Sequence, residues 1–92
     1  MKKLIIIYLD KDCANKACQN IANYVGDYRL EFSNDFDYDK PFKLRMKNAC
    51  EKYDHAAIVG NKEFKQDAVA LKNLKSGEQK LVKYYELYEN LK

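Results

Sequence analysis

The 92-residue sequence is poor in the residues from which catalytic and cofactor sites are built. It has a single histidine, His55, and three glycines that stand far apart, Gly26, Gly60 and Gly77. A P-loop and a dinucleotide-binding fingerprint both need clustered glycines, so neither is present. For His55, at the start of a predicted strand, a structural or surface role is favoured over a catalytic one. We therefore expect no catalytic residue and no cofactor in this chain.

The three cysteines, Cys13, Cys18 and Cys50, form neither a CxxC pair nor a cluster with histidine. An odd number of unclustered cysteines argues against a disulfide framework and against a zinc site. We expect reduced cysteines in a cytoplasmic protein and no bound metal. Cys13 lies near the start of a predicted helix, where the helix dipole could lower the pKa of the thiol, although small apolar cysteines on helices more commonly pack.

Long hydrophobic runs are also lacking. Two lysines precede the apolar run Leu4–Leu9, as in a secretory signal, but six residues are too few for one and favour a buried strand. Nothing else approaches a membrane span. The net charge of +3 is mild, far from that of a protein that holds nucleic acid by charge alone. A nucleic-acid role would need a local site or help from another domain.

The patterns that are present predict one folded domain, residues 1–92. The run Leu4–Leu9 is too short for a helix and predicts a strand buried on both faces, as in a parallel sheet. Apolar residues then recur at helical spacing from Ala14 to Val25. Asp12 is the predicted N-cap of this helix, and Gly26 is its predicted stop.

The middle of the chain repeats this alternation. Tyr28–Phe32 predicts a second strand, and Ser33–Asp39 predicts a polar, acidic loop. Pro41 suits the first turn of a second helix, whose apolar face extends to Tyr53. His55–Val59 predicts a third strand. The order βαβαβ with right-handed crossovers predicts a parallel sheet flanked by helices.

The last third of the chain predicts a hairpin and a closing helix. Asn61–Asp67 is a short connection of about one helical turn. Ala68–Leu74 and Gln79–Lys83 predict two strands, joined through a turn in which Gly77 takes a positive φ. Tyr84–Lys92 has helical spacing, and its tyrosines Tyr84 and Tyr88 are expected in the core. The predicted fold class is α/β, a three-layer α/β/α arrangement with a five-stranded mixed sheet covered by three helices.

Three motifs together resemble a known family. They are Gly60-x-x-Glu63, the hairpin Val69–Gln79 with its Ser-Gly-Glu-Gln turn, and the helix Phe42–Ala49 with its apolar-Lys-x-x-apolar-x-x-Ala pattern. In this combination the chain resembles the anticodon-binding domain of class II aminoacyl-tRNA synthetases, and most of all the C-terminal domain of histidyl-tRNA synthetases. The resemblance covers essentially the whole chain and agrees with the predicted strand order.

The resemblance implies a task. A domain of this family grips the anticodon stem-loop of a tRNA, so that a separate class II catalytic domain can attach the amino acid. Aminoacylation itself would not reside here, because that catalytic domain needs more residues than this chain contains. The domain would be part of a histidine–tRNA ligase, and the parent enzyme would be a homodimer.

The resemblance also implies RNA-binding residues: Arg45 and Lys43 in the second helix, Glu63 after the third strand, and Lys72 in the hairpin. Arg can stack on a base or hydrogen-bond its edge, Glu accepts from base amino groups, and Lys neutralises phosphate. Each residue also has a simpler interpretation. Arg45 and Lys72 could be solvated surface charges, Glu63 could only cap the turn after Gly60, and the lysines Lys40, Lys43 and Lys47 could be a solvated helix face.

Two features depart from the family pattern. The segment Glu51–His55 lacks a glycine common in the family and is one residue shorter. The loop Asp35–Asp39 carries three carboxylates, which would repel an anticodon loop. One alternative is therefore a free-standing accessory module that binds protein rather than RNA. Another is a small enzyme of flavodoxin-like topology, but its first loop, Asp10–Ala14, lacks the residues that hold a phosphate.

Overall fold

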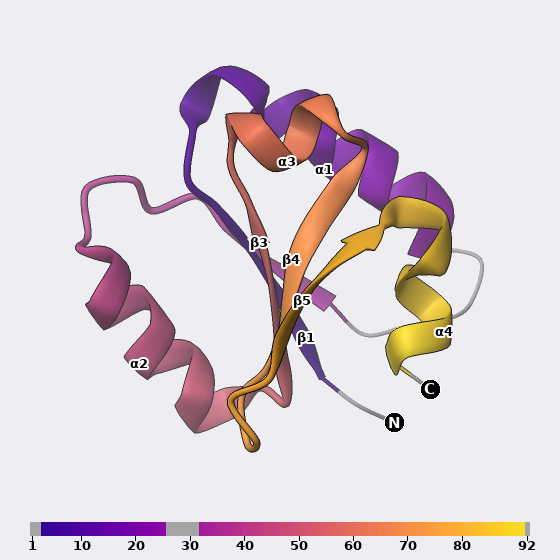
Figure 1. The fold of residues 1–92 in the computed structure, drawn as a ribbon. Helices are drawn as coiled ribbons and strands as arrows, with labels where there is room; N and C mark the ends of the chain where they lie inside the picture. The colour runs from indigo at the N-terminus through magenta and orange to yellow at the C-terminus, as the bar shows by residue number, and fades with distance from the viewer. Residues whose placement is uncertain (1–2, 26–31, 92) are drawn as a thin grey trace.

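The structure is a computed structural model that describes residues 3–25 and 32–91. The elements of this described part follow one another along the chain as drawn in Figure 1. They are β1 (Leu4–Tyr8), α1 (Lys11–Val25), β2 (Phe32–Asp35), α2 (Phe42–Lys52), β3 (His55–Val59), α3 (Asn61–Lys65), β4 (Ala68–Asn73), β5 (Gln79–Lys83), the 3₁₀ turn η2 (Tyr84–Glu86) and α4 (Leu87–Leu91).

The five strands form one mixed sheet in the order β2-β1-β3-β4-β5. β1 is parallel to both β2 and β3, whereas β4 is antiparallel to β3 and β5 is antiparallel to β4. The register places Ile5 beside Ala56, and Ala56 beside Lys72. The predicted five-stranded mixed sheet is confirmed.

Helices α1 and α2 lie on opposite faces of this sheet because the two crossovers run in opposite directions. The first leads from β1 outward to β2, and the second leads from β2 back across β1 to β3. A right-handed connection places its helix on one face in the first case and on the other face in the second. Figure 1 shows α2 alone on one side, with α1, α3 and α4 on the other. The three-layer prediction is confirmed, and α3 is the expected one-turn connection.

Strand β2 differs from its prediction. The expected strand Tyr28–Phe32 lies outside the described residues except for Phe32, while the polar segment that follows, predicted as a loop, forms the strand Phe32–Asp35. The loop prediction was wrong for Ser33–Asp35, because an edge strand such as β2 needs little apolar burial. Its polar side chains find partners instead, as Asp35 does in an ion pair with Arg45. Polarity alone therefore does not exclude an edge strand.

The start of helix α1 also differs from its prediction. The helix begins at Lys11, so Asp12 lies within its first turn and is not the N-cap. A carboxylate in the first turn still interacts favourably with the helix dipole. Asp10, which precedes the helix, accepts a hydrogen bond from the backbone N–H of Asn61 at 2.7 Å. The predicted stop at Gly26 lies outside the described residues.

The main core lies between the sheet and the layer formed by α1 and α4. Tyr84 is 2% exposed within it and Tyr88 packs against it partly buried, as predicted from their spacing. Burial raises the pKa of the Tyr84 hydroxyl to about 12. The buried members of this cluster are Leu4, Ile6, Tyr8, Ala14, Ala17, Ile21, Val25, Ala57, Val59, Val69, Leu71, Val82, Tyr84, Leu87 and Leu91.

The β4–β5 hairpin turns as the sequence predicts. Gly77 has φ +83°, a left-handed conformation that suits glycine, and its N–H donates to the carbonyl of Asn73 at 2.8 Å. The Asn73 side chain accepts from the N–H groups of Lys75 and Ser76 at 2.9 and 3.1 Å. The turn is thus closed by its own side chains, which fixes the register of the two strands.

Candidate nucleic-acid interface

Glu63 caps the short helix in which it lies. Its Oε1 accepts a hydrogen bond from the backbone N–H of Gly60 at 2.8 Å, and its side chain is partly buried. The simpler interpretation from the sequence, a cap on the turn after Gly60, is thus confirmed. A carboxylate has two oxygens with several acceptor positions, so this bond leaves capacity for a base amino group. RNA binding by Glu63 stays a prediction.

The first position of the Gly-x-x-Glu motif is a glycine because the space around Gly60 leaves little room for a side chain. A Cβ on Gly60 would lie 3.0 Å from the Glu63 Oε1 and 3.1 Å from the Asp10 Oδ2. Two carboxylates accept hydrogen bonds at the start of α3: Glu63 accepts from the Gly60 N–H, and Asp10 accepts from the Asn61 N–H. They satisfy backbone donors that a helix start leaves open. The motif thus ties the carboxyl ends of β1 and β3 together.

Arg45 is buried, with only 4% of its surface exposed. Its Nε donates to the Asp35 Oδ2 at 3.1 Å, and its Nη2 donates to the carbonyls of Tyr8 and Asp35 at 2.9 and 2.8 Å. The alternative of a solvated surface charge is therefore wrong. The guanidinium fastens α2 to the ends of β1 and β2, and its contact with RNA stays a prediction.

The sequence contained a signal for this role of Arg45. The residue falls between Phe42 and Ala49 at helical spacing, on the side of the helix that also carries Met46. A charge on such a side needs a buried partner. The nearest acidic segment was interpreted only as a repulsive loop, so its role as that partner was missed.

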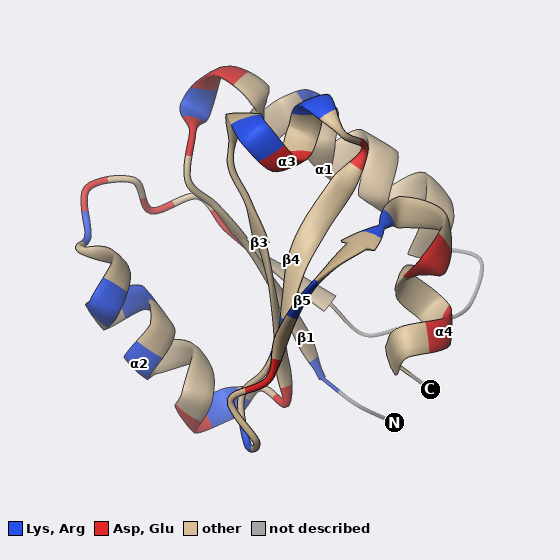
Figure 2. Ribbon diagram, viewed as in Figure 1, with Lys and Arg blue, Asp and Glu red and all other residues tan. Residues whose placement is uncertain are grey.

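Lys43 and Lys72 lie on the same side of the sheet as Arg45. Lys43 is exposed in the first turn of α2, a helix along which Figure 2 shows several Lys and Arg positions. Lys72 is half-buried in β4 and faces the side of Ala56, which packs beneath α2. Glu63 lies at the carboxyl edge of the neighbouring strand β3. Three of the four predicted residues therefore share one face, and the fourth lies at its edge.

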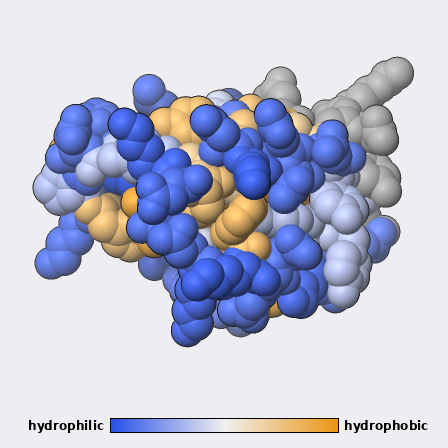
Figure 3. All heavy atoms as spheres, turned by 90° about the horizontal axis from the view of Figure 1, so that it is seen from above, coloured by the Kyte–Doolittle hydropathy of each residue, from blue (hydrophilic) through white to orange (hydrophobic). Residues whose placement is uncertain are grey.

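This face of the sheet is incompletely covered by α2. Among residues 3–25 and 32–91, the buried cluster there consists of Ile7, Ala49 and Ala56, with partly buried neighbours around it. Leu44 of α2 and Leu81 of β5 remain 41% and 54% exposed. Figure 3, which looks down on the molecule from the top of Figure 1 rather than onto this face, also shows hydrophobic surface among hydrophilic side chains. Exposed apolar surface rimmed by charge is typical of a binding face.

Burial shifts the pKa of two titratable groups in this part of the molecule, Cys13 and Tyr38. Cys13 is buried, as expected for a packing residue, and burial raises the pKa of its thiol, with the Asp10 carboxylate adding to the effect; the alternative of a lowered pKa was wrong. Burial likewise raises the pKa of Tyr38, while Arg45 opposes that shift. Within residues 3–25 and 32–91, no group of three or more metal-ligating side chains could hold an ion, and no helix is long and apolar enough to cross a membrane.

Comparison with known proteins decides the family. A family profile described as anticodon binding domain matches residues 3–92. The chain belongs to the anticodon-binding domains of class II aminoacyl-tRNA synthetases. This anticodon-binding domain is 31% identical over 91 residues to the histidine–tRNA ligase of Elusimicrobium minutum, an alignment that covers 92% of the chain and 20% of the ligase. The chain therefore spans about a fifth of the length of this relative.

Solved structures show the same fold at lower sequence identity. The histidyl-tRNA synthetase of Nostoc sp. PCC 7120 superposes with a TM-score of 0.83 at 18% identity, covering 95% of this domain and 21% of that chain. The RNA binding domain of threonyl-tRNA synthetase from Cryptosporidium parvum Iowa II gives the same TM-score at 11% identity, covering 98% and 22%. The anticodon-binding-domain fold is thus retained while most side chains differ.

Proposed function

We propose that this anticodon-binding domain grips the anticodon stem-loop of a histidine tRNA and positions it for a class II catalytic domain. The match to the family profile over residues 3–92 carries the proposal, and the histidine–tRNA ligase relative supports the choice of tRNA. The parent enzyme would be a homodimeric ligase in which this domain contributes binding rather than chemistry.

The open face beneath α2 is where we place the RNA. Helix α2 carries four cations and one carboxylate, and Lys43 and Lys47 are exposed on it. Lys72 of β4 lies on this same face, and the Glu63 carboxylate lies at the edge of the face. The lysines would bind phosphates of the RNA, and the Glu63 carboxylate would accept a hydrogen bond from the amino group of an unpaired base.

The test is binding of the domain to the anticodon stem-loop of tRNA(His), and to the same stem-loop with its anticodon replaced. Lys43→Ala and Lys72→Ala should each weaken the binding of both RNAs. Each should also reduce the slope of log affinity against log salt concentration by about one, because one phosphate contact is lost. Fluorescence anisotropy across a salt series measures both quantities. Unchanged slopes in both variants would show that neither lysine contacts a phosphate of the RNA.

Glu63 needs a variant that separates capping from recognition. Glutamine also accepts the Gly60 N–H bond, so Glu63→Gln should leave the helix start intact while removing the charge that attracts a base amino group. We expect this variant to lose the preference for the native anticodon with little change in melting temperature. Equal, weak binding of both RNAs to the unaltered domain would instead favour the accessory protein-binding module.

A further inference from the structure

Asp10 connects the first crossover of the sheet to the Gly-x-x-Glu motif. It is half-buried in the short connection between β1 and α1. Its Oδ2 accepts a hydrogen bond from the backbone N–H of Asn61 at 2.7 Å, across 51 positions of the sequence. The contact places Asp10 beside Glu63, the residue that the proposed function assigns to base recognition. A residue for which the sequence predicted no chemistry therefore lies next to a proposed RNA contact.

The carboxylates of Asp10 and Glu63 hold neighbouring backbone groups. Glu63 accepts from the Gly60 N–H at 2.8 Å, and Asp10 accepts from the next N–H along the chain. A Cβ on Gly60 would lie 3.0 Å from the Glu63 Oε1 and 3.1 Å from the Asp10 Oδ2, so both oxygens border the same small space. Two like charges at this separation repel each other, and each stays in place because it accepts from its own donor. The position of the Glu63 carboxylate therefore depends on where Asp10 holds the chain.

Helix α3 needs an external contact of this kind because it is short. It has only five residues, and none of these five described residues is fully buried. Helices of this length are unstable on their own in water. The Phe64 N–H closes the turn by donating to the Gly60 carbonyl at 2.9 Å, and the Phe64 ring packs partly buried against the main core. Asp10 fastens the first residue of α3 to the end of β1, and so fixes the direction in which α3 leaves β3.

Recognition of a base depends on this geometry more than attraction of a phosphate does. Charge attraction acts over about 8 Å at physiological ionic strength, so the lysines tolerate small displacements of the RNA. A hydrogen bond between a base amino group and Glu63 needs a donor–acceptor distance of about 3 Å and good alignment. Displacement of α3 by about 1 Å would therefore reduce discrimination between bases while phosphate binding continues.

We propose that Asp10 is a positioning residue for anticodon recognition: it holds α3 so that the Glu63 carboxylate accepts a hydrogen bond from a base amino group. The inference rests on the proposed function and adds to it a residue that does not itself touch the RNA. Recognition would require the hydrogen bond that Asp10 accepts rather than its charge. Asparagine keeps an acceptor oxygen at this position, whereas alanine has none.

The test measures the affinity of the whole chain for the tRNA(His) anticodon stem-loop and for the same stem-loop with its anticodon replaced. The ratio of the two affinities is the anticodon preference. Asp10→Ala should reduce this preference on the order of tenfold, as when a hydrogen bond to a charged group is lost. It should leave the affinity for the replaced anticodon nearly unchanged, and Asp10→Asn should keep the preference.

A double-mutant cycle separates positioning from general destabilisation. If Asp10 acts through Glu63, Asp10→Ala should lower the affinity for the native stem-loop in the unaltered chain, but not in a chain that already carries Glu63→Gln. A merely structural contribution would lower that affinity in both chains. Asp12→Ala is the matched control, because Asp12 is an exposed carboxylate two positions further along the chain. This control should keep the anticodon preference.

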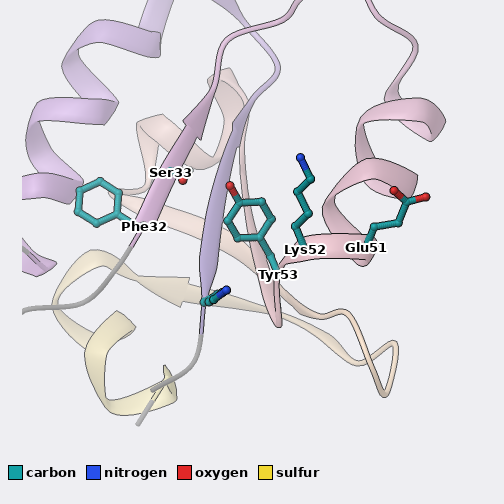
Figure 4. A pocket seen from close by; sticks show the side chains of 6 residues that line it. Phe32, Ser33, Glu51, Lys52 and Tyr53 are labelled. Carbon is teal, nitrogen blue, oxygen red and sulfur yellow. The ribbon is translucent and has the colours of Figure 1, made fainter.

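NMR signals show whether Asp10→Ala disturbs only α3. The Asn61 N–H should exchange faster with solvent in this variant, because its acceptor is gone. Tyr53 is the reporter for the opposite edge of the sheet, since it precedes β3 whereas Asp10 follows the parallel strand β1. Figure 4 shows Tyr53 among the side chains that line a cavity of about 630 Å³ between β2 and the end of α2. Changed Tyr53 signals would mean that Asp10 supports the whole sheet, and would overturn a specific action on α3.

Gly60→Ala provides a second variant in case Asp10→Ala does not fold. Gly60 has φ −115° and ψ −175°, an extended conformation that alanine adopts freely. The added methyl group would therefore crowd the Glu63 and Asp10 carboxylates without straining the backbone. We expect the anticodon preference to fall as in Asp10→Ala. An unchanged preference would show that recognition does not need the two carboxylates in these positions, and would overturn the proposal.

The remaining outcomes distinguish this inference from the proposed function. If the unaltered chain had no anticodon preference, both would be wrong. If Glu63→Gln lost the preference and Asp10→Ala kept it, the positioning action of Asp10 would be wrong and the proposed function would stand. If Asp10→Asn lost as much preference as Asp10→Ala, the charge of Asp10 rather than its hydrogen bond would be responsible, contrary to the proposal.

Discussion

The two faces of the sheet are packed very differently. Among the described residues, the face toward α1 and α4 has fifteen buried residues in one cluster, whereas the face toward α2 has three. The first cluster supplies most of the apolar burial and so most of the stability. The second holds α2 mainly through small residues and the polar anchor Arg45. The thinly packed layer therefore leaves apolar side chains such as Leu44 and Leu81 exposed, where the proposed RNA site lies.

Truncating an apolar side chain on each face tests this difference in packing. Ile21 of α1 is fully buried in the main cluster, whereas Met46 of α2 is only partly buried beside the smaller one. Ile21→Ala should lower the free energy of unfolding by about 2–4 kcal/mol, while Met46→Ala should lower it by about 1 kcal/mol. Urea denaturation monitored by circular dichroism measures both. Equal losses in the two variants would contradict the view that one face carries the stability.

The variant Arg45→Met tests whether polar contacts of Arg45, rather than apolar packing, hold α2 on the sheet. Arg45→Met removes the guanidinium donors that now serve the Asp35 Oδ2 and the carbonyls of Tyr8 and Asp35. We expect a loss of about 2–4 kcal/mol in the free energy of unfolding, because these partly buried acceptors lose their partner.

Two further variants serve as controls for this anchor. Adding Asp35→Asn to Arg45→Met should recover part of the loss, since the uncompensated charge disappears. The exposed pair Lys40–Asp37 offers a matched contrast, and Lys40→Ala should cost no more than about 0.5 kcal/mol. A loss for Arg45→Met as small as that of Lys40→Ala would show that α2 needs no anchor.

The strongly patterned elements could be predicted from the sequence. The buried run that became β1, the helical face of α1 and the hairpin with Gly77 each have a local cause in periodicity or turn chemistry. Strand β2 could not be predicted in this way, because its residues Ser33 and Asp35 are polar. What makes it a strand is pairing with β1, a contact that exists only after the chain has folded.

The candidate site was predictable only in outline. The alternation of β4 could place Lys72, and the motif could place Glu63 next to Gly60. The Arg45–Asp35 pair joins residues ten positions apart across a loop, and its geometry depends on the crossover onto the second face. Stacking of Phe36 on Tyr8 likewise joins the ends of two strands that meet only in the sheet. Such contacts are tertiary and have no local periodicity.

A weaker contribution comes from Asp54, which follows the carboxyl end of α2 and contacts the hairpin. Its carboxylate accepts from the Lys3 N–H at 2.9 Å and pairs with the Lys75 Nζ at 3.3 Å. The Lys3 hydrogen bond, aided by Lys75, holds the pKa of Asp54 below its ordinary value of 3.8. A lowered folded-state pKa contributes stability that is present above pH 3.8 and is lost as pH falls through the lowered value.

The variant Asp54→Asn tests this linkage, because it cannot titrate. The difference in melting temperature between the native domain and Asp54→Asn should shrink as the pH falls from 6 toward about 2, and it should be constant above about pH 5. Hydrogen exchange of the Leu74 N–H, which donates to the Asp54 carbonyl at 2.9 Å, reports whether the loosening is local. A difference that grew on acidification would reverse the sign, and would mean that protonated Asp54 is the form that holds α2 and the hairpin together.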